Sequence, residues 1–178
     1  MNKRISYSKK QQTGFTLIEL GIAIALIAIA VIIVIRTAGS VGSSSKASNE
    51  TAAMTQLISN SKAFKSGGTY GANTNMVPIL IQANQVPGAV NNGGGTLTNQ
   101  WGGAVTVVGN AATLTVTDAS VPKDACQTVV TGVGNGDTTI TVKVGSTVVP
   151  ETNGTITTGS AATACGTATN TLTFTSTN

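Results

Sequence analysis

The chain has 178 residues, of which 9% are charged and 3% are aromatic, and it contains no histidine. Because histidine is the commonest general base and metal ligand, its absence lowers the expectation of an enzyme. The formal net charge is +4, but four of the ten basic residues lie within the first ten positions. The remaining chain has six basic and six acidic residues, so its charge does not indicate nucleic-acid binding.

An apolar segment of membrane-spanning length follows the basic N-terminus. Residues 20–35 contain no charged side chain, and including residues 15–18 extends the segment to 21 residues with one interruption, at Glu19. At about 1.5 Å per residue, such a helix covers about 30 Å, the thickness of the hydrocarbon core of a bilayer. The preceding positive charges predict a cytoplasmic N-terminus and an exported C-terminal part.

Glu19 lies inside this apolar segment, where an ionised side chain costs roughly 2.5 to 3.5 kcal/mol. Cleavage between Gly14 and Phe15 would create an α-amino group four residues before Glu19, and this group is largely cationic at neutral pH. The amine could pair with Glu19 of its own helix or of a neighbouring subunit, where the pair would set the axial register. The alternative is an ordinary secretory signal cleaved within residues 39–45, which leaves Glu19 unexplained.

The residues from Gly14 to Leu20, Gly-Phe-Thr-Leu-Ile-Glu-Leu, together with the apolar segment resemble the prepilin-peptidase motif of type IV pilins and pseudopilins. The resemblance implies that residues 1–14 are a cleaved leader and that Phe15 is N-methylated. Residues 15–36 would serve first as a transmembrane helix and then as the filament core. The implied location is the bacterial inner membrane, with an exported head, and later the extracellular pilus.

The same resemblance implies a set of partners. The first is the chain itself, as a helical homopolymer. The others are the prepilin peptidase, an inner-membrane platform protein, an assembly ATPase and an outer-membrane secretin, with the membrane as the environment before assembly.

Residues 37–66 are expected to form a hinge and an amphipathic helix. Glycines and serines are frequent in residues 37–45, so this stretch predicts either a flexible hinge or a plain linker. Beyond Ser48, apolar residues recur at helical spacing, which predicts one face directed at a head domain. These residues are Met54, Leu57, Ile58 and Phe64. The helix is expected to end near Gly67 and Gly68.

Residues 67–178 are expected to form a globular β head. A surface loop with a short helix at residues 76–81 comes first. Alternating threonine and apolar residues then predict strands. The ranges are 104–108, 113–117, 139–144 and 171–175. Gly109-Asn110 between the first two is consistent with a hairpin turn, whereas the alanines that follow indicate a looser loop. An antiparallel sheet packed on the amphipathic half of the helix, with the hydrophobic half protruding, makes this an α+β fold.

Cys126 and Cys165 are the only cysteines, and both lie in the predicted exported part. An even number of cysteines in an oxidising compartment predicts one disulfide. In the chain-entropy description, such a bridge stabilises the head by roughly 4 kcal/mol. A redox-active pair is the alternative, but the close spacing and basic neighbours of such pairs are missing.

Three parts of the head resemble type IVb pilins of toxin-coregulated, bundle-forming and thin conjugative pili. They are residues 97–105 around Trp101, residues 121–126, and Cys165 with the following strand to Phe174. The resemblance implies the pilin fold, with an exposed, variable region bounded by Cys126 and Cys165. Phe15 and the leader of 14 residues are closer to type IVa pilins.

These features predict the major structural subunit of a type IV pilus. One alternative is a minor pilin or adhesin whose head binds a surface or DNA, and another is a pseudopilin of a type II secretion system. A pseudopilin would hold calcium, but Asp118, Asp124 and Asp137 follow no calcium-loop spacing. The head also lacks a recognisable nucleophile and base, so the sequence predicts no catalytic residue, metal or cofactor.

Overall fold

The computed structural model describes residues 17–91 and 93–177, without the side chains of residues 17, 19 and 28–41. The contacts divide the chain into two compact units, Met1–Ser40 and Val41–Asn178. The second unit contains all the strands of the described residues and is the head.

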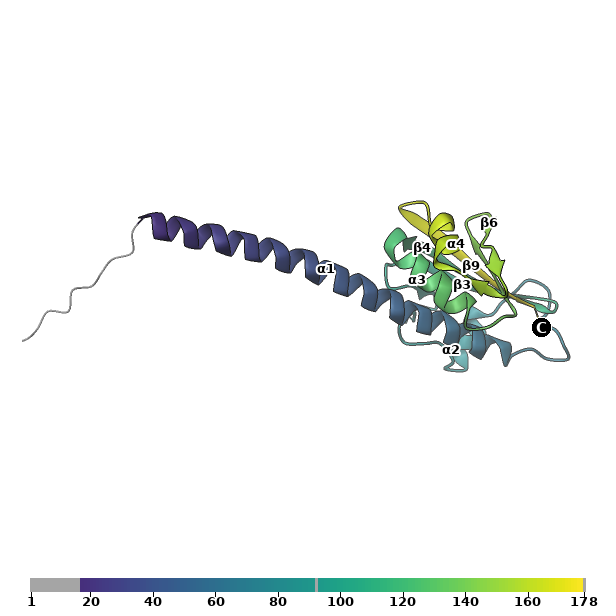
Figure 1. The fold of residues 1–178 in the computed structure, drawn as a ribbon. Helices are drawn as coiled ribbons and strands as arrows, with labels where there is room; N and C mark the ends of the chain where they lie inside the picture. The colour runs from purple at the N-terminus through teal and green to yellow at the C-terminus, as the bar shows by residue number, and fades with distance from the viewer. Residues whose placement is uncertain (1–16, 92, 178) are drawn as a thin grey trace, which may run out of the picture. The chain divides into compact units, whose positions relative to one another are not determined.

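The longest element is α1, Leu17–Lys62, a helix of 46 residues that continues from the first unit into the second (Figure 1). Its backbone is helical throughout residues 37–45, where a hinge or linker was expected. Glycine and serine lower helix stability by about 1 kcal/mol or less per residue, and helix propagation from both sides compensates for this cost.

The helix α1 ends at Lys62, before the expected end at Gly67 and Gly68. After Lys62 the backbone tightens, because the N–H groups of Ala63 and Phe64 donate to carbonyls three residues earlier. Gly67 and Gly68 then have positive φ angles of 59° and 82°, which suit glycine. The helix therefore ends in a tight turn, and the two glycines lie after that turn.

The head contains a seven-stranded antiparallel sheet with the order β1-β3-β4-β9-β5-β6, in which β2 also pairs with β3. The strands are β1 Thr74–Asn75, β2 Leu97–Thr98, β3 Ala104–Asn110, β4 Thr113–Pro122, β5 Ile140–Val144, β6 Thr147–Val148 and β9 Thr169–Thr177. A separate hairpin consists of β7 Glu151–Thr152 and β8 Thr155–Ile156. The four strands expected from the alternating pattern correspond to β3, β4, β5 and β9, so this part of the prediction is confirmed.

The turn between β3 and β4 lies at the alanines that follow Gly109-Asn110, not at Gly109-Asn110 itself. Gly109 and Asn110 belong to β3, and the chain reverses at Ala111, whose φ angle is 48°. Gly109 is needed for packing, because a β-carbon at this position would lie 2.4 Å from Tyr70 Cβ. Gly109 therefore allows Tyr70 to pack closely against β3 and does not form the turn.

Three further helices belong to the head. The short helix α2, Val77–Gln82, lies where one was expected, whereas α3, Lys123–Gly134, and α4, Thr158–Ala164, were not expected. The helix α3 begins after Pro122, which is extended, and has Asp124 in its first turn. It contacts β4, β5, β9 and α4.

One hydrophobic core joins the head part of α1, residues 41–62, to α3 and the sheet. Met54, Leu57 and Ile58 of α1 are buried in it, and Phe64 packs partly buried against it, as the helical spacing predicted. Among the described residues, the largest fully buried side chain is Phe174 of β9. Each fully buried residue of this size contributes about 1.5 to 3 kcal/mol to the hydrophobic stabilisation.

Candidate functional site

The processing motif falls mostly outside the described part of the chain. Gly14 and Phe15 are not described, and Glu19 lies in α1 without a described side chain. Cleavage after Gly14, methylation of Phe15 and pairing of its amino group with Glu19 therefore stay predictions.

The described apolar side chains of the first unit are strongly exposed. Six of them are between 53% and 74% exposed, namely Ile18, Leu20, Ile22, Ile24, Leu26 and Ile27. At about 100° per residue, these positions lie on all sides of α1, so the helix has no polar face here. Such a helix requires an apolar environment on all sides, as in a protein core or a lipid phase.

Whether a helix can cross a bilayer depends on its length and its hydropathy. Among the residues that the structure describes, no helix is long and apolar enough to cross a membrane.

In the second unit, α1 packs closely on α3. A β-carbon at Gly132 of α3 would lie 2.4 Å from Thr51 Cγ2. The Thr51 hydroxyl donates to the Ala47 carbonyl oxygen over 2.8 Å, which fixes the orientation of the side chain. The two helices therefore contact each other at a point where only glycine fits.

Two carboxyl side chains are fully buried in the head, Glu50 of α1 and Asp118 of β4. Two adjacent residues bind these carboxyl groups: Gln100 binds Glu50, and Asn99 binds Asp118. The Gln100 backbone N–H donates to Glu50 Oε2 over 3.0 Å, and Asn99 Nδ2 donates to Asp118 Oδ1 over 2.7 Å. The turn that follows β2 thus connects α1 to β4 through two carboxyl groups.

This turn is held tightly against β4. Asn99 Nδ2 also donates to the Ala119 carbonyl oxygen over 2.6 Å, and Asn99 Oδ1 accepts the Gly103 backbone N–H over 2.7 Å. A β-carbon at Gly103 would lie 1.9 Å from the Ala119 carbonyl oxygen. The register of β4 against β9 shifts between Asp118 and Val121, so the Asn99 side chain contacts β4 at this irregularity.

The environment of both carboxyl groups favours the neutral form. Burial, as the larger cause, and the charge of Asp118 together raise the pKa of Glu50 from an ordinary value of 4.5 to about 7, against the lowering effect of the Gln100 bond. Burial raises the pKa of Asp118 from 3.8 to about 6, against the bond from Asn99. Neither Glu50 Oε1 nor Asp118 Oδ2 accepts a hydrogen bond from a described residue.

Neither carboxyl belongs to a recognised motif, but the spacing of each contains a signal. Glu50 lies four and seven residues before Met54 and Leu57, on the apolar face of α1. Asp118 follows Leu114 and Val116 at alternate positions, which point to the buried side of a strand. An acid in phase with apolar neighbours therefore indicated burial in both elements.

The two cysteines form a disulfide between α3 and the end of α4. The Cα atoms of Cys126 and Cys165 are 5.9 Å apart, and both residues are fully buried. The bridge closes a segment that contains β5, β6, the β7-β8 hairpin and α4. It therefore fixes this segment to α3 in the core.

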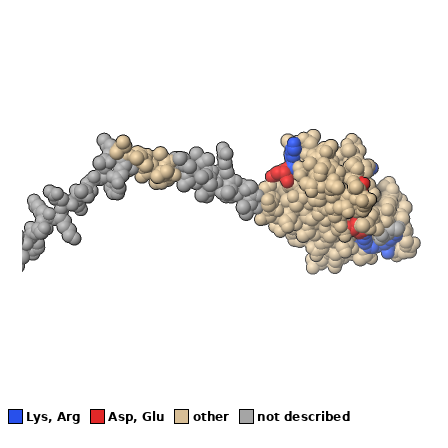
Figure 2. Space-filling view, viewed as in Figure 1, with Lys and Arg blue, Asp and Glu red and all other residues tan. Residues whose placement is uncertain are grey.

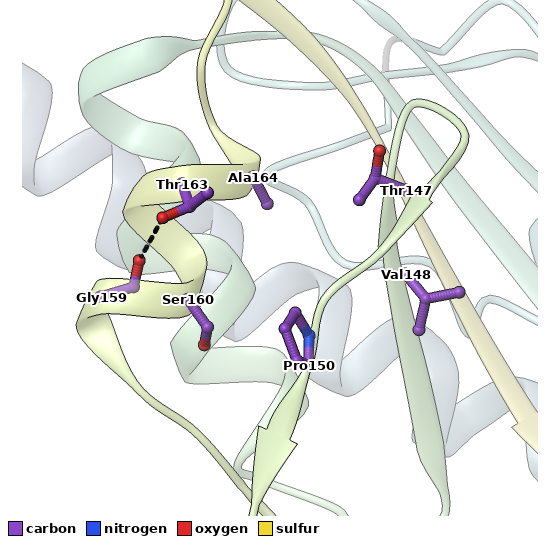
Figure 3. A pocket seen from close by; sticks show the side chains of 7 residues that line it. All are labelled: Thr147, Val148, Pro150, Gly159, Ser160, Thr163 and Ala164. Carbon is purple, nitrogen blue, oxygen red and sulfur yellow. Dashed lines mark hydrogen bonds between the residues drawn. The ribbon is translucent and has the colours of Figure 1, made fainter.

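A pocket of about 370 Å³ lies within the disulfide-bounded segment, between α4 and the chain around β6 (Figure 3). Its lining residues are Thr147, Val148, Pro150, Gly159, Ser160, Thr163 and Ala164. The Thr163 hydroxyl donates to the Gly159 carbonyl oxygen over 3.0 Å within α4. Because the lining has no charged group, the pocket offers neither a general base nor a ligand set for a metal ion.

Charged side chains are few on the face of the head seen in Figure 2. Lys62 at the end of α1 pairs with Asp137 over 2.5 Å, and this bond, together with two hydrogen bonds from Thr139, lowers the pKa of Asp137 to about 2. Asp124 accepts a hydrogen bond from Ser43 of α1. The three aspartates considered for calcium thus have separate environments, since Asp118 is buried beside Asn99.

The N-terminal residues and the head each match a family model. Residues 9–35 match the prokaryotic N-terminal methylation motif, and residues 44–177 match the family described as PilS N terminal. No curated protein is similar enough in sequence to count as a match.

Solved structures of type IV pilins resemble the chain over most of its length. The crystal structure of a type IVb pilin from Salmonella typhi is 28% identical with a TM-score of 0.56, over 70% of this chain and 95% of that one. The pilin TcpA from Vibrio cholerae El Tor is 18% identical with a TM-score of 0.50, over 75% of this chain and 99% of that one, and it supports the fold. The chain therefore belongs to the PilS family of type IVb pilins.

Proposed function

We propose that this protein is the major structural subunit of a type IVb pilus, made as a prepilin that is cleaved after Gly14 and N-methylated at Phe15. The observation that carries the proposal is the continuity of α1. One helix of 46 residues has exposed apolar side chains at residues 18–27, inside the matched methylation motif, and a buried apolar face in the head.

The exposed apolar residues of the first unit explain why the subunit would first reside in the bacterial inner membrane and then assemble. A helix that is apolar on all sides requires lipid or other protein, and identical helices in a filament provide the second environment. The amino group of mature Phe15 would pair with Glu19 of a neighbouring subunit, because two opposite charges in an apolar medium favour one stagger.

The remaining parts of the proposal follow from membership of the pilin family. The prepilin peptidase would process the chain, and a platform protein, an assembly ATPase and a secretin would extrude the filament. The protein would act as a polymer subunit rather than as an enzyme, and it would need no cofactor.

The test is the composition of filaments sheared from the cell surface. We expect the most abundant chain to begin at methylated Phe15 in N-terminal sequencing. Its intact mass should rise by two hydrogens on reduction, as the Cys126–Cys165 bridge requires.

Three outcomes would contradict the proposal. A chain that keeps residues 1–14 would overturn the cleavage site, and a chain cut near Gly42 would indicate an ordinary secreted protein. A correctly processed chain that is only a trace component of the filament would instead indicate a minor pilin.

A further inference from the structure

The buried pair of Glu50 and Asp118 has no role in processing or in the apolar N-terminal helix. Glu50 belongs to the head part of α1, and Asp118 lies on β4, 68 positions later in the chain. Both are 0% exposed, and each keeps one oxygen that accepts no hydrogen bond from a described residue. A fully ionised pair would therefore place two poorly compensated charges in the core.

Few charged groups are available to compensate this pair. In α1 the described cations are Lys46, which is exposed one turn before Glu50, and Lys62, which is paired with Asp137. In α3 the charged residues are Lys123 and Asp124, while β2, β3, β9 and the turn 99–103 contain no titratable side chain.

The charge of Asp118 acts on Glu50 and is unfavourable to its ionisation. Protonation of the carboxyl groups therefore reduces the buried charge.

We propose that Glu50 and Asp118 form a proton-binding site that latches the head part of α1 to β4, and that loss of its protons loosens this contact. The latch consists of the two carboxyl groups and the Asn99-Gln100 dipeptide that binds both. It acts within one head, so it does not depend on whether the chain is the major filament subunit.

The sign of the pH dependence follows from the direction of both shifts. The pKa of Glu50 rises from 4.5 to about 7, and the pKa of Asp118 rises from 3.8 to about 6. The closed head therefore binds more protons than the opened chain between about pH 4 and pH 7. The free energy by which the latch stabilises the closed head is largest below this pH range, falls as the pH rises through the range, and is constant above it.

The experiment is hydrogen exchange of the full-length protein in detergent micelles from pH 5 to pH 8, with each rate corrected for the intrinsic effect of pH. We follow peptides from residues 47–62 of α1 and 113–122 of β4. The equilibrium constant for opening the contact between α1 and β4 should increase at least about tenfold in the wild type from pH 5 to pH 8, since one pKa unit corresponds to a factor of ten.

Two variants remove the titration and keep the hydrogen bonds. Glu50→Gln retains an oxygen for the Gln100 N–H, and Asp118→Asn retains one for Asn99. Each should reduce the pH dependence, and the double variant should abolish it. Glu151→Gln is the matched control, because Glu151 is an exposed carboxyl in β7, and it should show the full wild-type dependence.

Two results would overturn the latch. One is a wild-type opening equilibrium that stays constant from pH 5 to pH 8. The other is a double variant with the same pH dependence as the wild type. If the double variant does not fold, the infrared band of a neutral carboxyl group in the wild type decides the question. The band must be present at pH 6, where an ordinary carboxyl group is already ionised, and must disappear as the pH rises to 8.

Discussion

A β-carbon at Gly132 would lie 2.4 Å from Thr51 Cγ2, so α1 and α3 touch where a single hydrogen replaces a side chain. This contact fixes the helix that would enter the filament against the helix that contains Cys126. The same residue pair provides a direct test of how tightly α1 is held in the head.

We expect Gly132→Val to destabilise the head by about 1 to 3 kcal/mol, the usual cost of overpacking. Urea unfolding of the purified protein measures the change. Thr51→Ser should restore part of the loss, because it removes Cγ2 and keeps the hydroxyl that binds Ala47. Gly88→Val is the matched control, since no atom lies within 4 Å of a β-carbon there. An equal effect of both glycine replacements would contradict the close helix contact.

Replacing Cys126 and Cys165 with serine should lower the free energy of unfolding by about 4 kcal/mol, because the bridge restricts the unfolded chain. Unfolding curves with and without a reductant provide the measurement. Reductant should shift the wild-type curve to that of the double variant and leave the variant unchanged. A wild-type curve that is insensitive to complete reduction would show that the bridge adds no stability.

We expect Glu19→Val to enter the membrane and lose its leader normally but to be excluded from filaments formed with wild-type subunits. The reason is that the variant cannot offer a carboxylate to the amino group of Phe15 in the next subunit. Mass spectrometry of sheared filaments from cells that express both chains gives the incorporated fraction. Glu19→Asp keeps the charge and should be incorporated better than Glu19→Val. Equal incorporation of Glu19→Val and wild type would rule out charge pairing.

Gly14→Glu should leave the leader attached, since a bulky charged residue replaces the small residue before the cleavage site. The membrane-bound chain should then keep the mass of residues 1–14 and yield no N-methylated Phe15. Gly14→Ala is the control with a small side chain, and it should still be processed. A Gly14→Glu chain that begins at Phe15 would disprove the assigned cleavage site.

The Lys62–Asp137 pair should stabilise the head above about pH 4. The folded pKa of Asp137 is lowered from 3.8 to about 2, so this stabilisation is lost as the pH falls from about 4 to 2. Because both side chains are partly exposed, we expect at most about 1 kcal/mol. Lys62→Met should reduce the loss of stability in thermal unfolding between pH 5 and pH 2. Lys143→Met, which removes an exposed lysine, should not change it.

The alternating strands and the apolar face of α1 could be predicted because each pattern repeats within a few residues. The expected strands at residues 104–108 and 171–175 became the longer β3 and β9, and Met54 and Leu57 proved to be buried. These patterns depend on local geometry, with a period of two in strands and 3.6 in helices. The N-terminal motif was equally local, and it also matches a family model.

The helix α3 shows where local preference failed. Its residues 128–132 are Thr-Val-Val-Thr-Gly, which individually favour strands or turns over helices. The segment is nevertheless helical because Cys126, Val129, Val130 and Val133 then point together into the core. Burial of that face outweighs the weak propensity of its residues.

The sequence by itself determined the motif at Gly14 and Phe15, the main strands, and which two cysteines could pair. Only the tertiary structure decided that Glu50 and Asp118 are joined through Asn99 and Gln100, and that Gly132 meets Thr51. The physical reason is sequence separation. Periodicity states which side of an element is buried, but the partner on that side depends on how distant elements pack.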